Sequence, residues 1–119
     1  MKKNILQELK EEAEFPYNYG KPNEIEGFVE LNPSCGDQVK IYPLISDTSV
    51  KIYFESEGCT LSKAMASLLA RYVEIHDLEY LKKLTEAEIL AEILDLKLGP
   101  NRSKCALLPI LALKRAIKC

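Results

Sequence analysis

The chain has 119 residues and a mass of 13.5 kDa, which is the size of one ordinary domain. Hydrophobic residues make up 47% of it and charged residues 29%, a balance typical of a soluble globular protein and not of a disordered one. Its net charge of −2 and pI near 5.5 argue against a general nucleic-acid binder, which needs a basic face. We expect residues 1–119 to form a single domain, with 1–24 as an N-terminal helix and loop.

The sequence also argues against a membrane or secreted protein. No apolar run approaches the roughly 18 residues that a membrane span needs, and residues 1–8 become acidic before the apolar core of a signal peptide could form. We therefore expect a cytoplasmic protein, monomeric or weakly dimeric, that binds neither nucleic acid nor membrane. The single histidine, His76, excludes a multi-histidine metal site, and its charged surroundings predict an ordinary surface position.

The first 23 residues predict a helix followed by a loop. Apolar residues recur at helical spacing among lysines and glutamates over 4–14. Residues 15–23 then contain two prolines and a glycine, which break the pattern, and three aromatic residues, which can pack on a core. The alternative is a floppy arm ahead of a domain that starts near Ile25.

Three short strands are predicted next, at 26–31, 38–42 and 50–55. In the last two, apolar and polar residues alternate, as a half-buried antiparallel sheet requires. The segments 32–37 and 46–49 are rich in turn-forming residues and separate the strands. Together these segments predict a three-stranded antiparallel sheet.

After Gly58 the apolar period changes to that of a helix. The residues of its apolar stripe are Leu61, Met65, Leu68, Leu69 and Tyr72. Such a stripe is typical of a helix that packs on a core.

Three further helical segments follow. Residues 78–84 predict a short helix or turn, and Thr85 with Glu88 forms a capping box that opens the next helix. The last helix is predicted over 105–117, which would put Pro109 in its first turn, where the missing N–H costs little. The predicted fold is α+β: a three-stranded antiparallel sheet packed with about five helices, most of which follow it in sequence.

Three of the four cysteines stand where secondary structure begins or turns. Cys35 lies in the turn between two predicted strands, and Cys59 and Cys105 lie at predicted helix N-termini, where the helix dipole favours the thiolate. The fourth, Cys119, is expected to be an unconstrained exposed thiol. Because a reducing cytosol disfavours disulfides, such cysteines are more often buried, catalytic or metal-bound than paired.

The spacings of 24 and 46 residues between the first three cysteines exclude a zinc finger and a C-x-x-C redox pair. Three dispersed thiolates and Asp37, two residues after Cys35, could still converge as a four-coordinate site, because zinc accepts Cys and Asp ligands in tetrahedral geometry. Two alternatives stay open at this point. The cysteines could be three unrelated thiols, and Asp37 could be only a turn residue.

The cysteines lie in three motifs that together are similar to those of a known family. The motifs are Asn-Pro-Ser-Cys-Gly-Asp at 32–37, Ser-Glu-Gly-Cys-Thr-Leu-Ser-Lys-Ala at 56–64 and Arg-Ser-Lys-Cys-Ala at 102–106. In this order they resemble the signatures of IscU/SufU/NifU-type iron–sulfur cluster scaffold proteins, over about residues 25–118. The resemblance implies a SufE/IscU-like α+β fold. A structural domain with incidental cysteines remains a further interpretation only if the motif match is accidental.

The resemblance also implies a function and a site. Proteins of this type receive persulfide sulfur from a cysteine desulfurase, assemble a [2Fe–2S] cluster with iron and pass it to apo-proteins. The implied site is exposed at one end of the molecule and is formed by Cys35, Asp37, Cys59 and Cys105, of which Cys105 or Cys35 accepts the sulfur. Such a scaffold is not an enzyme that turns over a small substrate.

Departures from the family patterns leave a second function open. Lys104 stands where the IscU branch has a histidine, whereas Arg102, Lys104 and Cys105 match the Arg-x-Lys-Cys pattern of the SufU branch. Yet the separation of 46 between Cys59 and Cys105 leaves no room for the insertion that SufU proteins carry there. The alternative function is therefore a zinc-bound sulfurtransferase that accepts persulfide from a desulfurase. Lys104 is predicted to lower the pKa of the neighbouring thiols, with Arg102 as a further supporting residue.

Overall fold

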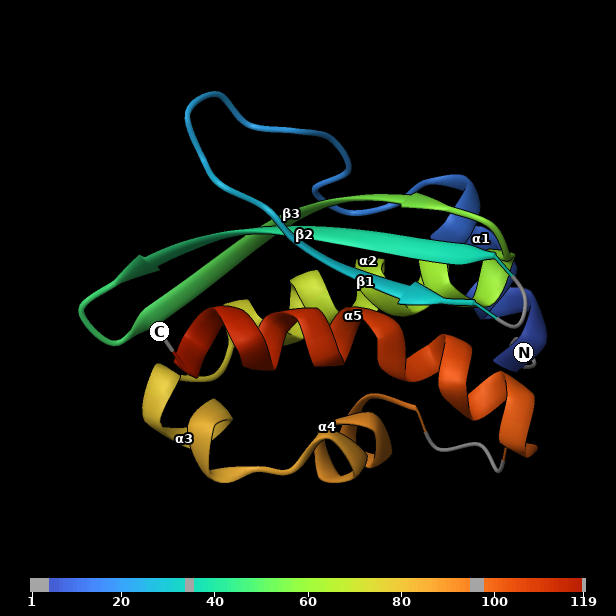
Figure 1. Ribbon diagram of the computed structural model, residues 1–119. Coiled ribbons are helices and arrows are strands. Elements are labelled where there is room, and N and C mark those ends of the chain that lie inside the picture. Colours follow the sequence, from blue (N-terminus) through green and yellow to red (C-terminus); the bar gives the residue numbers. More distant parts are fainter. Residues whose placement is uncertain (1–4, 34–35, 95–97, 119) are drawn as a thin grey trace.

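The computed structural model describes residues 5–33, 36–94 and 98–118, with side chains described from Gln7 onward. Within these residues three strands and five helices form the predicted α+β fold (Figure 1). In chain order they are α1 (Ile5–Glu14), β1 (Phe28–Asn32), β2 (Asp37–Ser46), β3 (Ser49–Glu57), α2 (Thr60–Glu74), α3 (Leu78–Lys83), α4 (Glu86–Ile93) and α5 (Pro100–Lys118). None of the helices in these ranges is both long and apolar enough to cross a membrane.

The sheet has the strand order β1-β2-β3 and is antiparallel throughout. β2 lies in the centre, where its Ile41 pairs with Phe28 of β1 and with Phe54 of β3. β2 and β3 are longer than predicted: both continue to a tight turn at Asp47 and Thr48, and β3 also extends to Glu57 at its other end. The sequence pattern missed these ends because the side chains near the turn are exposed and so do not alternate with buried ones.

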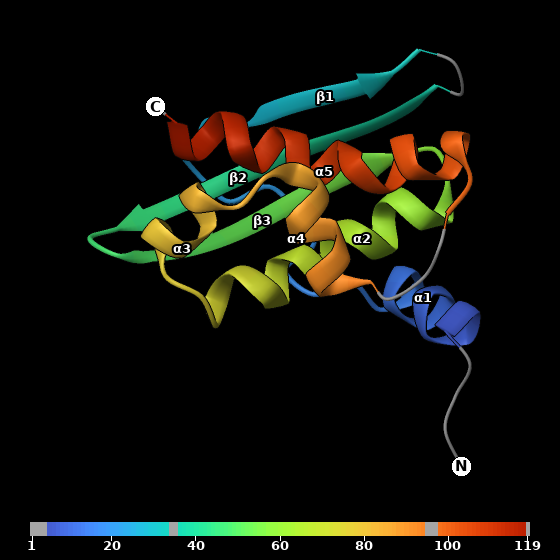
Figure 2. The same ribbon diagram turned by 90° about the horizontal axis from the view of Figure 1, so that it is seen from below.

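Helices cover one face of the sheet. α2 and α5 lie side by side against this face, and α3 and α4 lie on the outer side of the helical layer (Figures 1 and 2). The core between the sheet and these two helices includes Ile41, Ile52, Phe54, Met65, Leu69, Ile110 and Leu113. Full burial of such a side chain contributes about 1.5–3 kcal/mol. As a result, the start of β2 and the N-terminal turns of α2 and α5 come to the same end of the molecule.

The N-terminal segment packs on the rest of the chain instead of forming a floppy arm. Leu9 and Ala13 of α1 are buried against α2, and the backbone N–H of Tyr17 donates to the Ser67 hydroxyl of α2 at 2.8 Å. The expectation that all three aromatic residues of the loop pack on a core is wrong for Phe15. This residue directly follows the end of α1 and is 74% exposed.

The last helix begins earlier than predicted. α5 starts at Pro100, so Pro109 lies inside the helix and not in its first turn. A proline at the first helical position needs no N–H, whereas Pro109 has no N–H to donate to the carbonyl of Cys105. Such an interior proline costs about 3 kcal/mol, which the burial of its neighbours Leu108 and Ile110 offsets.

Two other features hold the outer helices in place. The predicted capping box of Thr85 and Glu88 is present at the start of α4. Lys114 of α5 is buried, and its Nζ donates to the carbonyls of Leu81, Lys82 and Leu84 at 3.1, 3.1 and 2.7 Å. A positive charge at this point caps the C-terminus of α3, where carbonyls have no helical partner.

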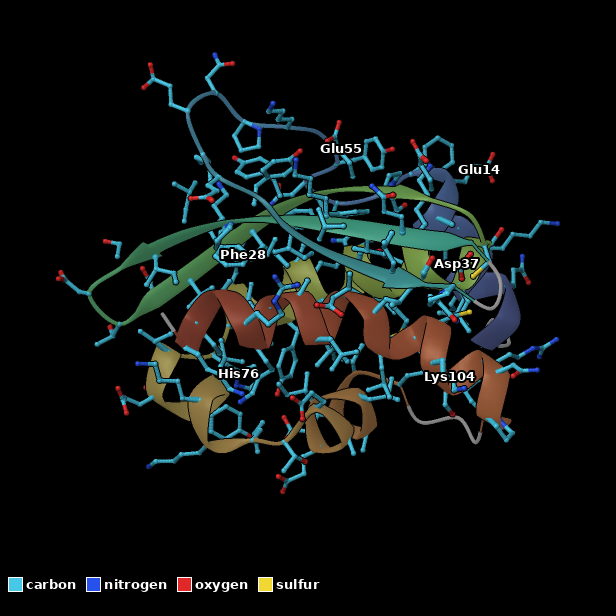
Figure 3. The ribbon with its side chains drawn as sticks, viewed as in Figure 1. Glu14, Phe28, Asp37, Glu55, His76 and Lys104 are labelled. Carbon is cyan, nitrogen blue, oxygen red and sulfur yellow. The ribbon has the colours of Figure 1, made fainter. Side chains whose placement is uncertain are left out.

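His76 is not the ordinary surface residue that was predicted. It is half-buried and lies between the rings of Tyr72 and Tyr80, with ring centroids 4.3 and 4.8 Å away. Both tyrosine hydroxyls donate to the carboxylate of Glu92, and these hydrogen bonds lower the pKa of Glu92. This cluster joins α2, α3 and α4 and thus has a structural role, and His76 lies toward the opposite end of the molecule from Asp37 (Figure 3).

Candidate metal centre

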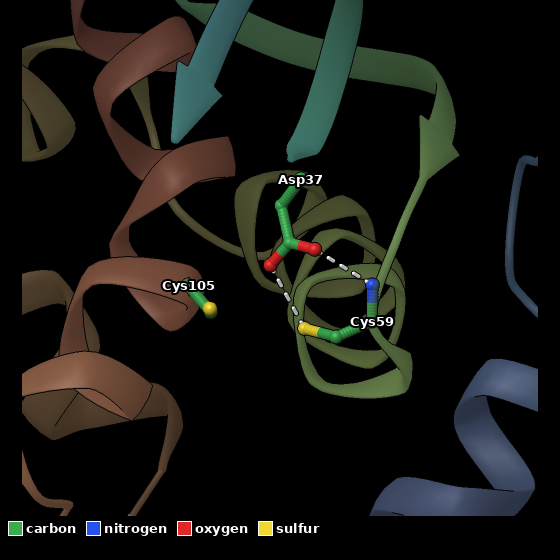
Figure 4. A group of neighbouring side chains, drawn as sticks. All are labelled: Asp37, Cys59 and Cys105. Carbon is green, nitrogen blue, oxygen red and sulfur yellow. Dashed lines mark hydrogen bonds between the residues drawn. The ribbon is translucent and has the colours of Figure 1, made fainter. Parts of the chain in front are cut away.

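Three residues that are remote in sequence meet at one end of the molecule. One ligand atom each from Asp37, Cys59 and Cys105 lies within 4.8 Å of the other two. They come from the first residue of β2, from the junction of β3 with α2, and from α5 (Figure 4). Cys35, the fourth predicted ligand, lies outside the described residues. Among the residues that the structure describes, the predicted convergence of dispersed side chains is therefore present.

Asp37 is tied into the site by both of its carboxylate oxygens. Oδ1 accepts the backbone N–H of Cys59 at 2.8 Å, and Oδ2 accepts the Cys59 thiol at 3.0 Å (Figure 4). The residue is only 2% exposed. Hydrogen bonds to a carboxylate are stronger than those between neutral groups. Asp37 is therefore more than a turn residue, because it joins the start of β2 to the start of α2.

Cys59 begins α2, as predicted. It is the N-cap residue, and its sulfur accepts the backbone N–H of Ser62 at 3.5 Å. The preceding Gly58 has φ +117°, and a Cβ atom there would lie 2.2 Å from Asp37 Oδ1. Only glycine fits this close approach. Gly58 is a site residue that the sequence reasoning did not single out, although its position directly before Cys59 was the available signal.

Cys105 is not at a helix N-terminus, contrary to the prediction. Because α5 begins at Pro100, Cys105 lies in the second turn, beyond the reach of the free N–H groups at the helix start. It is buried, and its sulfur accepts a hydrogen bond from the side-chain amide of Asn32, with Nδ2 3.8 Å from Sγ. Asn32 is a second residue that the sequence reasoning missed, although it opens the motif that contains Cys35 and Asp37.

The site lies at one end of the molecule, as the resemblance implies, but it is less exposed than expected. Asp37 and Cys105 are 2% and 8% exposed, because the β1–β2 hairpin and the start of α2 pack around them. Lys104, which precedes Cys105, points away from it by about 100° around the helix and is exposed (Figure 3). Its predicted effect on the thiols therefore remains a prediction.

Cys59 is half-buried and, among the residues that the structure describes, it borders two hollows. The first has a volume of about 400 Å³ and is lined mainly by apolar side chains, with Arg102 at its edge. The second, of about 420 Å³, is polar and includes Lys10 and Lys63. The two hollows share Lys10, Cys59 and Thr60, so they are neighbouring openings beside Cys59.

The donor set suits zinc or iron. Cysteine sulfur and a carboxylate oxygen are both zinc ligands, and a tetrahedral zinc with bonds of about 2.3 Å places two sulfurs about 3.8 Å apart. The separations within 4.8 Å are close to that requirement, so small side-chain movements are enough. Because the Cys59 thiol donates to Asp37, binding of a metal would release this proton.

Comparison with known proteins identifies the family of this chain. The profile of the NifU-like N terminal domain family matches residues 4–119. The iron-sulfur cluster assembly scaffold protein IscU of Thermotoga maritima is 36% identical over 103 residues, which cover 73% of this chain and 72% of that protein. The zinc-dependent sulfurtransferase SufU of Bacillus subtilis is 30% identical over 105 residues, which cover 72% of this chain and 70% of that protein.

Solved structures show the same fold. The N-terminal part of a nitrogen-fixing NifU-like protein from Brucella abortus has a TM-score of 0.72 at 22% identity and covers 94% of this chain and 90% of its own. A candidate SUF-system scaffold from Fervidobacterium islandicum has a TM-score of 0.78 at 24% identity, with coverage of 93% and 94%. The chain belongs to the NifU-like N-terminal domain family, whose relatives include the iron–sulfur cluster assembly scaffold proteins IscU and SufU.

Proposed function

We propose that this protein is a cytoplasmic scaffold that accepts sulfur from a cysteine desulfurase, binds iron, builds a [2Fe–2S] cluster and transfers it to apo-proteins. Its proposed ligands are Cys35, Asp37, Cys59 and Cys105. The observation that carries the proposal is the approach of one carboxylate and two cysteine sulfurs within 4.8 Å from three separate elements. Cys35 is proposed as the fourth ligand because it lies two residues from Asp37.

A carboxylate ligand suits a protein that must give its cluster away. Iron–sulfur clusters are normally held by four thiolates, and an oxygen ligand is harder and weaker toward such a cluster. The two carboxylate oxygens of Asp37 have different roles in this proposal. The bond from the Cys59 N–H anchors Oδ1, while loss of the Cys59 thiol proton frees Oδ2 to bind a metal. The bond between the metal and Oδ2 is then the first to break when the cluster is transferred.

Sulfur acceptance is a thiol–disulfide-type exchange. The thiolate of Cys105 or Cys35 attacks the outer sulfur of the desulfurase persulfide, a new S–S bond forms on the acceptor, and the desulfurase cysteine leaves as a thiolate. The acceptor is identified by mass spectrometry after incubation with a desulfurase and cysteine, with single Cys→Ser variants. Sulfur found only on Cys119 would contradict both assignments.

The function itself is tested by anaerobic reconstitution with iron, cysteine and a desulfurase. The unsubstituted protein (the parent) should develop the visible absorption of a [2Fe–2S] cluster. This absorption should be lost in Cys59→Ser. The matched control is Cys119→Ser, which removes a thiol outside the proposed ligand set and should leave the spectrum unchanged. A parent that develops no cluster absorption under these conditions contradicts the proposal.

A zinc-bound sulfurtransferase is the second candidate function. The observation that favours it is the run of Arg102, Lys104 and Cys105, which is SufU-like, together with a donor set that zinc also accepts. In that case the protein would be an enzyme, because it would pass persulfide sulfur on repeatedly. Metal analysis of anaerobically prepared protein separates the two: stoichiometric zinc without visible absorption favours the sulfurtransferase.

A further inference from the structure

Asn32 connects the loop that contains Cys35 with the helix that contains Cys105. It is the last residue of β1 and pairs with Asp37 across the β1–β2 hairpin. Its carbonyl accepts the N–H of Gly36 at 2.9 Å, which closes the loop. Its side chain is 7% exposed, and its amide nitrogen lies 3.8 Å from the sulfur of Cys105.

The two cysteine sulfurs of the site receive their hydrogen bonds in different ways. Cys59 is an N-cap residue, so the free backbone N–H of Ser62 reaches its sulfur. Cys105 lies in the second turn of α5, where backbone N–H groups are used inside the helix. A donor to its sulfur must come from another element, and Asn32 supplies one from 73 residues away.

We propose that Asn32 is a positioning residue of the metal site. Its amide N–H holds the Cys105 sulfur toward Asp37 and Cys59, and it draws electron density from that sulfur when the sulfur binds a metal. The amide is neutral, so it does so without adding charge beside the carboxylate of Asp37. This inference rests on the proposed function, because it requires that these residues bind a metal.

The partners of metal ligands orient the ligands and tune the metal. Hydrogen bonds to sulfur are among the features that set the electronic properties of metal–thiolate sites. Removing the donor should therefore have two effects. The site should bind a metal less tightly, because Cys105 loses the hydrogen bond from Asn32, and its sulfur should donate more electron density to the metal that remains bound.

Titration of anaerobic protein with Co²⁺ tests both effects, since thiolate-to-cobalt charge-transfer bands report on sulfur directly. The variants are Asn32→Leu, which has a similar size but no polar group, and Asn32→Ala, which removes the amide and adds neither a charge nor a metal ligand. In each, we expect the dissociation constant for Co²⁺ to rise at least about tenfold. At saturating Co²⁺, the charge-transfer bands should move to lower energy.

Gln38→Leu is the matched control. Gln38 lies in the same hairpin next to Asp37, and successive residues of a strand point to opposite faces. This variant also loses one amide, and its affinity and bands should equal those of the parent. Unchanged bands in both Asn32 variants, with or without weaker binding, would overturn the inference, because a purely structural role does not alter sulfur donation. A parent without thiolate bands would instead contradict the proposed function. Should Asn32→Leu fail to fold, Asn32→Ala decides the result.

Discussion

Gly58→Ala is the substitution that most directly tests how the site is built. The residue has φ +117°, which L-residues rarely adopt, and the added methyl carbon would lie 2.2 Å from Asp37 Oδ1 and 2.9 Å from Asp37 Cα. The second contact is with backbone, so a rotation of the Asp37 side chain cannot relieve it. Either the start of β2 or the β3–α2 junction must move, and the bond between Asp37 and the Cys59 N–H must lengthen or break.

Two contributions set the size of the effect. Backbone strain at such a φ costs about 1–3 kcal/mol, and loss of a hydrogen bond to a charged group costs about 1.5–3 kcal/mol. Together we expect Gly58→Ala to lower the free energy of unfolding by about 2.5–6 kcal/mol, a large part of the total of about 5–15 kcal/mol for a domain. Because Asp37 is displaced, the dissociation constant for zinc should rise by at least about tenfold.

Gly20 provides the control for strain alone. It has φ +128°, and no atom lies within 4 Å of its added Cβ position. Gly20→Ala should therefore cost only the strain of about 1–3 kcal/mol and leave the zinc affinity unchanged. The measurements are urea unfolding of the metal-free proteins and competitive zinc titration. If Gly58→Ala is no less stable than Gly20→Ala and binds zinc as the parent does, the contact of Gly58 with Asp37 does not organise the site.

Three further predictions concern single residues. Asp37→Ala should slow cluster transfer to an apo-ferredoxin and lower the affinity for zinc, because it removes the proposed carboxylate ligand. If the transfer rate and the zinc dissociation constant are both unchanged, Asp37 is only a hairpin residue. Lys114→Met removes the donor to three carbonyls at the end of α3. It should lower the free energy of unfolding, measured in urea, by about 2–4 kcal/mol and leave the zinc affinity unchanged. A loss below about 1 kcal/mol would contradict this role of Lys114. Burial and the hydrogen bond to Glu55 raise the pKa of Tyr42 from 10.0 to about 12. The stability that its neutral phenol contributes is therefore complete below pH 10 and is lost as the pH rises to about 12. The stability of the parent relative to Tyr42→Phe should therefore fall over that window in alkaline unfolding experiments, and a constant difference would contradict the prediction.

Local periodicity was sufficient to predict most elements of the fold. Alternation at 50–55 and the helical stripe from Leu61 to Tyr72 depend on neighbours a few residues apart, and so does the capping box at Thr85. The start of α5 was predicted wrongly because residues 100–104 are largely exposed and show no apolar period. The interior position of Pro109 also could not be predicted, because packing of the whole helix outweighs its local cost.

For the candidate site, the residue types that could bind a metal were predictable from the sequence, and the three ordered motifs indicated the family. The spacings of 24 and 46 between the cysteines contain no information about distance in space. Only the packed fold shows that Asp37, Cys59 and Cys105 meet. The position of Cys35 relative to them stays a prediction.

Only the tertiary structure decided which neighbours hold the side chains of this candidate site. Gly58 meets Asp37 because the antiparallel register pairs Gln38 with Glu57 and so brings the end of β3 beside the start of β2. Asn32 reaches Cys105 because α5 packs on β1 and β2. Both contacts depend on how complete elements pack, and a pattern that is read over a few residues does not encode such long-range geometry.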